Sequence, residues 1–122
     1  MKPTKKTLVI GASDNPERYS YKAMHLLKRH GHPIIGIGKK AVQVADTTVQ
    51  TGLPELSDID TVTLYVNPVH QEAYYNYILS MHPKRVIFNP GTENPEFEDR
   101  LEAAGIQAQE ACTLVLLSTG QY

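Results

Sequence analysis

A short apolar run that ends in a glycine turn lies near the start of this chain. Residues 7–10 (TLVI) lead into Gly11, Ala12 and Ser13, and a polar stretch follows before helical periodicity begins at Ser20. This order of strand, glycine turn and helix forms an anion cradle in α/β domains, because backbone N–H groups and the positive end of the helix dipole converge there. The stretch lacks the full G-x-G-x-x-G pattern, so it indicates a nucleotide-type ligand more strongly than it indicates NAD.

Short apolar runs alternate with amphipathic stretches along the chain. Runs without polar alternation are typical of strands buried on both faces, and they cover residues 7–10, 33–37, 61–66, 85–88 and 106–108. Cap residues, prolines and glycine stops delimit helices, which are predicted over residues 20–30, 67–81 and 94–105. Strand–helix alternation of this kind gives a parallel sheet with right-handed crossovers.

Two segments do not follow this alternation. Residues 38–60 show no helical periodicity, and the valine-rich stretch 42–49 predicts a short extra strand within this crossover. Residues 113–118 fit either a strand or a short helix, and we favour a helix closed by Gly120. The predicted fold class is therefore α/β: a single domain over residues 1–122, with a mainly parallel sheet of five or six strands and helices on both faces.

Composition agrees with one globular domain. The chain has 122 residues, a net charge of −1 with neutral histidines, and an ordinary 41% of hydrophobic residues. This balance gives no global basis for binding nucleic acid or an anionic membrane surface. Cys112 is the single cysteine, so no internal disulfide can form, and no apolar run approaches a signal-peptide core or a membrane span. We expect a soluble cytoplasmic protein.

Candidate phosphate-binding residues follow the first predicted strand. Ligands of doubly wound sheets bind beyond the carboxyl ends of the strands, where small and polar residues let a diphosphate approach the backbone. The candidates in this loop are Gly11, Ala12, Ser13, Asn15, Arg18 and Ser20. Backbone N–H groups and serine hydroxyls would hold the phosphates. An ordinary polar turn between a strand and a helix is the alternative interpretation.

The loop after the second predicted strand carries a glycine and two lysines, Gly38, Lys39 and Lys40. An NAD site usually has an acidic residue here that accepts from the ribose 2′-OH. Ammonium groups beside an adenosine ribose suit an extra phosphate instead, as in NADP or in the 3′-phosphate of coenzyme A. A solvated lysine pair explains the same residues without a ligand.

Three further loops meet the same predicted edge. Two of them follow strands and contain Asn-Pro, with the residues Val66, Asn67, Pro68 and Asn89, Pro90, Gly91. Helix capping fully accounts for the first asparagine and less well for the second. Cys112, after the last strand, is either a thiol near the ligand or a small buried packing residue. No spacing is typical of a zinc site or of a catalytic constellation, so we expect neither a metal nor catalytic residues.

Several short motifs occur in a characteristic order and spacing. They are residues 9–13 (VIGAS), 15–20 (NPERYS), Gly31, 53–56 (LPEL), 89–91 (NPG), 104–106 (AGI) and Cys112. Together they resemble the small CoA-binding protein family over nearly the whole chain. The single Rossmann-like domain of that family is similar to the N-terminal domain of the succinyl-CoA synthetase α subunit.

The resemblance implies where coenzyme A would lie. Its diphosphate would face residues 11–13 with Arg18 and Ser20, and its adenosine end would lie near residues 38–40. Residues 66–68 would border the adenine, and residues 89–91 would border the path of the pantetheine.

The chain departs from the family pattern in three places. Residues 37–39 are Ile-Gly-Lys where the family usually has Val-Asn-Pro. Residues 88–89 are Phe-Asn where Trp is common before the proline-glycine turn. Residues 110–112 are Glu-Ala-Cys in place of Asp-Arg-Cys.

The leading hypothesis is a stand-alone module that binds coenzyme A or an acyl-CoA and is not an enzyme, since the ligase relatives need a second domain and a partner subunit. The alternative is an NADP- or other adenine-nucleotide-binding domain of oxidoreductase type. Two further hypotheses are a mixed disulfide between Cys112 and the CoA thiol, and an interaction domain with a vestigial pocket. Tyrosines at 74, 75 and 77 suit packing and an oligomer surface, which leaves a homo-oligomer or an enzyme partner open. No nucleic acid or membrane partner is expected.

Overall fold

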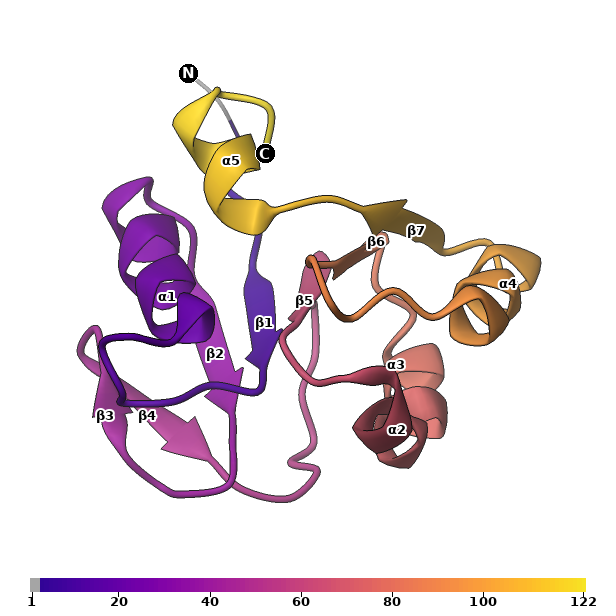
Figure 1. Ribbon diagram of the computed structural model, residues 1–122, viewed down its shortest axis with the longest axis horizontal. Helices are drawn as coiled ribbons and strands as arrows, with labels where there is room; N and C mark the ends of the chain where they lie inside the picture. The colour runs from indigo at the N-terminus through magenta and orange to yellow at the C-terminus, as the bar shows by residue number, and fades with distance from the viewer. Residues whose placement is uncertain (1–2) are drawn as a thin grey trace.

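A seven-stranded sheet forms the middle layer of the protein, whose computed structural model describes residues 3–122 (Figure 1). The strand order is β3-β4-β2-β1-β5-β6-β7, and neighbouring strands are parallel except for the antiparallel pair β3 and β4. The strands are β1 (Thr7–Ile10), β2 (Ile34–Ile37), β3 (Gln43–Val44), β4 (Thr47–Gln50), β5 (Thr61–Leu64), β6 (Arg85–Phe88) and β7 (Gln107–Glu110). The predicted α/β class with a mainly parallel sheet is confirmed.

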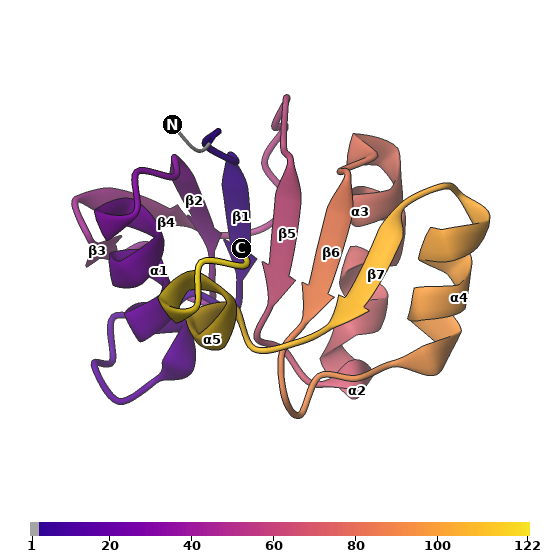
Figure 2. The same cartoon turned by 90° about the horizontal axis from the view of Figure 1, so that it is seen from above.

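Helices cover both faces of the sheet (Figures 1 and 2). On one face α1 (Tyr19–Arg29) packs against α5 (Thr113–Ser118). The other face carries α2 (Pro68–Gln71), the 3₁₀ turn η1 (Glu72–Tyr74), α3 (Tyr75–Met81) and α4 (Pro95–Ala103). Because side chains of a strand alternate between faces, Leu8 and Ile10 of β1 enter the core under α3 and α4, whereas Val9 enters the core under α1.

The sheet has seven strands, where five or six were predicted, because the crossover after β2 contains a hairpin. Val44 and Val49 are buried while Gln43 and Thr48 are exposed to solvent. The side chains of β3 and β4 therefore alternate between a buried face and a solvent-exposed face. The turn residues 45–46 have φ angles of 51° and 59°, as a tight hairpin turn requires. β4 then pairs in parallel with β2 and widens the sheet. The other element bounds agree with the prediction to within two or three residues.

The helix predicted over residues 67–81 is not continuous. It divides into α2, η1 and α3, with the 3₁₀ turn directly after Gln71. The side-chain amide of Gln71 is fully buried and donates to the backbone oxygens of Val66 and Thr92 at 2.9 and 2.7 Å. These bonds attach the last residue of α2 to the loops after β5 and β6. The interruption of the helix after Gln71 therefore depends on tertiary contacts, which the periodicity of the sequence does not show.

The tyrosines of this region pack within the chain. Tyr75 is 8% exposed and stacks on Phe97 of α4, with the ring centroids 4.2 Å apart. The hydroxyl of Tyr77 donates to the carbonyl oxygen of Pro54, which ties α3 to the crossover before β5. Among residues 3–122, no helix has the length and apolar character needed to cross a bilayer.

Candidate functional site

The register of the sheet brings all the predicted loops to one edge. Ile10 of β1 is level with Ile37 of β2 and Leu64 of β5, and Leu64 is level with Phe88 of β6, which is level with Glu110 of β7. The next residues therefore lie side by side at the carboxyl edge: Gly11, Gly38, Tyr65, Asn89 and Ala111. This is the edge at which doubly wound sheets bind ligands.

Two glycines let the backbones of adjacent loops touch at this edge. Gly11 has a φ of 93°, and a Cβ there would lie 3.0 Å from the carbonyl carbon and oxygen of Tyr65. At Gly38 a Cβ would lie only 2.3 Å from the carbonyl oxygen of Ala12. Both positions therefore require glycine, which gives Gly38 a packing reason that is independent of any ligand.

The amides of Gly11 and Ala12 do not face a ligand site. Both donate to the carbonyl oxygen of Ile37 at 2.9 Å, so they join the β1 loop to the end of β2. The expectation that these two N–H groups hold a diphosphate is therefore corrected. Their role is to fix the loop, and donors for an anion must come from Ser13 onward.

The segment from Ser13 to α1 is organised by its own side chains. The Ser13 hydroxyl accepts from the Asn15 amide at 3.1 Å, and the Asn15 side-chain oxygen accepts from the Glu17 amide at 3.0 Å. Arg18 takes the N-cap position of α1 but its side chain makes no capping hydrogen bond. Among residues 3–122, no side chain therefore accepts from the first-turn N–H groups of α1, in contrast with α2 and α4, which Asn67 and Asn94 cap.

Three cations belong to the loops that follow β1 and β2 at this edge of the sheet. Arg18 lies at the helix start, and Lys39 and Lys40 follow β2; all three are exposed. None of these charged groups has a polar partner within residues 3–122. Asp14 and Glu17 are exposed in the loop that precedes Arg18, so this loop carries charges of both signs. Ser20 is 3% exposed and is the second residue of α1.

Asn89 is a positioning residue. It is 2% exposed, and its side-chain amide donates to the Thr63 hydroxyl at 2.7 Å and to the Leu64 carbonyl at 2.8 Å. Its side-chain oxygen accepts from the Thr113 amide at 2.9 Å. The side chain thus joins the ends of β5 and β6 to the start of α5 and has no surface left for a ligand. Pro90 and Gly91, next in the loop, are exposed.

Gln71 is a site residue that the sequence did not reveal. Its side-chain nitrogen donates to Val66 and Thr92, as described above, and its side-chain oxygen accepts from the side-chain amide of Asn94 at 2.9 Å. It therefore holds the loop after β5 against the loop after β6, which are the predicted adenine and pantetheine loops. No sequence signal distinguishes this glutamine from an ordinary polar residue of a helix. Asn67 is confirmed as a helix cap, with its side chain 3.2 Å from the His70 amide.

Cys112 lies half-buried at the N-cap of α5, between the predicted pantetheine loop and the buried Thr113. The hydroxyl of Thr113 forms a 2.8 Å hydrogen bond with the hydroxyl of Thr63. The Tyr65 hydroxyl is buried beside both threonine hydroxyls, which oppose part of the effect of burial on its pKa, but no atom of residues 3–122 meets it in good hydrogen-bond geometry. Burial raises the pKa of Tyr65, so this group stays neutral beside the cysteine.

Replacing Tyr65 by Phe is expected to raise the free energy of unfolding by about 1 kcal/mol, because a buried hydroxyl without a partner carries a desolvation penalty. Tyr75→Phe is the matched control. The Tyr75 hydroxyl accepts from the Asn94 side-chain amide at 2.7 Å, so its loss should lower the stability by about 1 kcal/mol. Urea unfolding of both variants measures the difference. Equal destabilisation by the two changes would show that the Tyr65 hydroxyl has a partner, such as the hydroxyl of Thr63 or Thr113.

Metal-ligating side chains do not gather in the described part of the chain. No group of three or more histidine, cysteine, aspartate or glutamate side chains is placed to hold an ion among residues 3–122. The groups that meet at the carboxyl edge are backbone amides, carboxamides, hydroxyls, one thiol and unpaired cations, together with the exposed carboxylates of Asp14 and Glu17. The donors and cations among them suit the binding of an anionic, polar ligand.

The chain was compared with known families and structures. The sequence profile of a family described as "CoA binding domain" matches residues 5–118. A crystal structure of an uncharacterised protein is 50% identical and has a TM-score of 0.96, covering 99% of this chain and 100% of its own. No protein with a curated description matches.

Two more distant structures share the fold. A hypothetical protein from Pyrococcus horikoshii OT3 is 25% identical with a TM-score of 0.86, and the match covers 95% of this chain and 83% of that one. A protein from Thermus thermophilus is 21% identical with a TM-score of 0.81, and the match covers 97% and 91%.

Proposed function

Because this chain belongs to the CoA-binding domain family, we propose that it is a stand-alone module that binds coenzyme A or an acyl-CoA without catalysis of its own. The observation that carries the proposal is the uncapped start of α1 beside unpaired cations at the carboxyl edge. A helix start of this kind supplies N–H donors and a positive dipole end to an anion. The groups gathered there bind and orient a ligand.

The diphosphate is placed against the segment that follows Ala12. Ser13, the first turn of α1 and the Arg18 guanidinium supply the donors, since the amides of Gly11 and Ala12 are engaged with Ile37. Glycine at positions 11 and 38 lets the loops after β1 and β2 pack backbone against backbone, which fixes where this segment begins.

The remaining parts of coenzyme A are assigned along the edge. Lys39 and Lys40, exposed and without polar partners, face the 3′-phosphate of the adenosine. Residues 66–68 border the adenine. The pantetheine passes the exposed Pro90 and Gly91 toward Cys112, whose half-buried position leaves its thiol near the end of that path. The proposal places the protein in the cytoplasm, where its lone cysteine stays a thiol.

Calorimetric titration with coenzyme A, dephospho-CoA and NADPH tests the proposal. We expect coenzyme A to bind most tightly and dephospho-CoA to bind about five- to tenfold more weakly, since it lacks the phosphate that the lysines face. The double variant Lys39→Gln/Lys40→Gln should weaken the binding of coenzyme A by a similar factor and leave the affinity for dephospho-CoA unchanged.

A matched control separates local contacts from overall charge. Lys28→Gln/Lys84→Gln removes the same charge from positions remote from the carboxyl edge, and it should leave coenzyme A binding unchanged. Tighter binding of NADPH than of coenzyme A would favour the oxidoreductase-type nucleotide domain. Absence of binding to all three nucleotides would contradict the proposed function and favour a vestigial pocket.

A further inference from the structure

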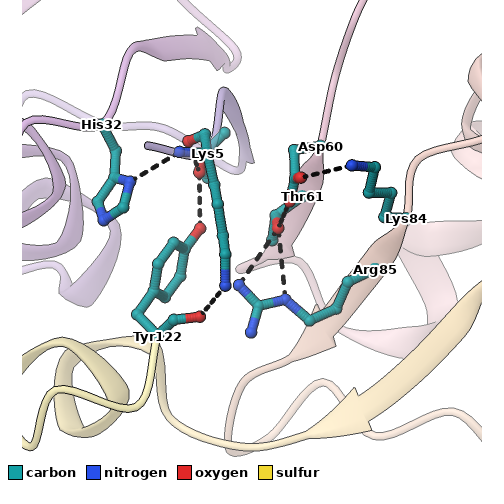
Figure 3. Close-up of polar contacts among 8 residues, drawn as sticks. Lys5, His32, Asp60, Thr61, Lys84, Arg85 and Tyr122 are labelled. Carbon is teal, nitrogen blue, oxygen red and sulfur yellow. Dashed lines mark hydrogen bonds and ion pairs between the residues drawn. The ribbon is translucent and has the colours of Figure 1, made fainter. Parts of the chain in front are cut away.

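A polar cavity lies at the opposite edge of the sheet, and Figure 3 shows the polar contacts of the residues around it. It has a volume of about 340 Å³ and opens at the amino ends of β1, β5, β6 and β7. Its walls carry three cations, Lys5, Lys84 and Arg85, and one carboxylate, Asp60. The length of the strands separates it from the proposed coenzyme A site.

Arg85 is a buried guanidinium that only neutral groups contact. The residue is 8% exposed, and its Nε and Nη2 donate to the Thr61 hydroxyl at 3.3 and 3.2 Å. Nη1 donates to the side-chain oxygen of Gln109 at 3.3 Å, and the guanidinium carbon lies 4.5 Å from the centre of the Tyr122 ring. No side-chain carboxylate of residues 3–122 comes within 4.0 Å of the guanidinium.

The hydrogen-bonding capacity of Arg85 is therefore not used up. An arginine has five N–H donors, two of them on each terminal nitrogen. One bond is made from Nη1 and one from Nη2, which leaves one N–H on each nitrogen without an acceptor in the described structure. A pair of terminal N–H groups is the fork that accepts a carboxylate or a phosphate in a bidentate manner.

The charge around this fork is unbalanced. Lys5 donates from its Nζ to the main-chain oxygen of Tyr122, the last residue of the sequence, and Nζ of Lys84 lies 3.8 Å from Oδ2 of Asp60. Asp60 also accepts from the Thr61 hydroxyl at 2.7 Å, so the three cations outnumber the carboxylates around them.

The titration of the neighbouring groups agrees with an excess of positive charge. Burial and then the charge of Arg85 lower the pKa of Lys5, against the opposing effect of Asp60. His32 adds no charge at neutral pH, because its Nδ1 accepts from the Lys5 amide at 3.0 Å and burial lowers its pKa.

We propose that this cavity binds a small oxyanion, held by the free N–H groups of Arg85 and by the ammonium groups of Lys5 and Lys84. A buried guanidinium without a counter-ion is costly, and an oxyanion supplies both the charge and the two missing acceptors. The volume is sufficient for a free phosphate, or for the phosphate or carboxylate of a small metabolite. The site is independent of the proposed coenzyme A site, because no residue is shared between them.

Titration of inorganic phosphate, followed by amide shifts in ¹⁵N-labelled protein, tests the proposal. We expect saturable shifts at Thr61, Arg85 and Gln107, with a dissociation constant in roughly the millimolar range. The same titration with acetate distinguishes the two oxyanion sources, since both should shift these amides and the tighter of the two identifies the ligand. Saturable shifts confined to residues 13–20 would place phosphate at the α1 start and overturn this proposal while leaving the coenzyme A proposal intact.

Two variants keep the test decisive. Arg85→Lys retains the charge and removes the fork, so phosphate should bind about tenfold more weakly. The Lys84 side chain is 84% exposed, so Lys84→Gln leaves the bonds of Arg85 to Thr61 and Gln109 intact. It should weaken phosphate binding about threefold. Lys39→Gln is the matched control and should have no effect on the shifts at Arg85. Unchanged phosphate affinity in Lys84→Gln, or no saturable shift in the wild type, would contradict the proposal.

Discussion

Asn89→Ala is expected to lower the free energy of unfolding by about 3–5 kcal/mol, the largest effect of any single polar side chain discussed above. The change removes three buried hydrogen bonds at once. It leaves the Thr113 amide and the Leu64 carbonyl without these partners in a region where water does not reach them. The start of α5 and the ends of β5 and β6 then lose their common attachment, so coenzyme A binding should weaken as well.

Asn67→Ala is the natural control for Asn89→Ala, because both asparagines follow a strand and precede a proline. Asn67 is exposed and caps α2 through one hydrogen bond of 3.2 Å, so its loss should cost about 1 kcal/mol. Denaturant unfolding of both variants measures the two values. Similar losses at the two positions would mean that the buried amide of Asn89 is no more than a local cap.

Gly38→Ala is expected to destabilise the protein by about 3 kcal/mol, because the new methyl group meets backbone rather than a flexible side chain. A Cβ at this position would lie 2.3 Å from the Ala12 oxygen, 3.2 Å from the Ala12 carbonyl carbon and 3.2 Å from a methyl carbon of Val49. The loop after β1 must move away from β2, which weakens the bonds from Gly11 and Ala12 to Ile37. Coenzyme A affinity should fall together with stability.

Gly52→Ala separates steric overlap from the loss of glycine's freedom. Gly52 has a φ of 73° and open space around its Cβ position, so the substitution carries only the conformational penalty, about 1 kcal/mol. Thermal unfolding and coenzyme A titration of both variants provide the comparison. A Gly38→Ala protein with wild-type stability and affinity would show that the two loops can separate freely.

The parts of the fold that could be predicted from sequence are those governed by neighbouring residues. β1 and β6 have the predicted bounds because their apolar runs are uninterrupted, and Asn94 caps α4 as its position before a proline indicates. The convergence of the loops at one edge also follows from strand–helix alternation alone. The hairpin β3–β4 was predicted as one strand because its two-residue turn carries Ala and Asp rather than the usual glycine.

The parts that could not be predicted depend on atoms distant in the chain. The amides of Gly11 and Ala12 are engaged with Ile37, and no local pattern shows that they are unavailable to a phosphate. Gln71 and Asn89 read as ordinary polar residues until their buried partners are known. The same holds for Arg85, which begins an otherwise apolar strand and meets Tyr122 only in the folded chain.

β1 divides its fully buried side chains between the two cores, as described for Leu8, Val9 and Ile10. It is also hydrogen-bonded on both sides, to β2 and to β5. When the helices of one layer open transiently, β1 still has the other layer against it, so its amides should exchange with solvent among the slowest in the protein. The loop after it therefore starts from a rigid anchor. If coenzyme A binds there as proposed, little of its binding energy should be spent on ordering the backbone of this loop.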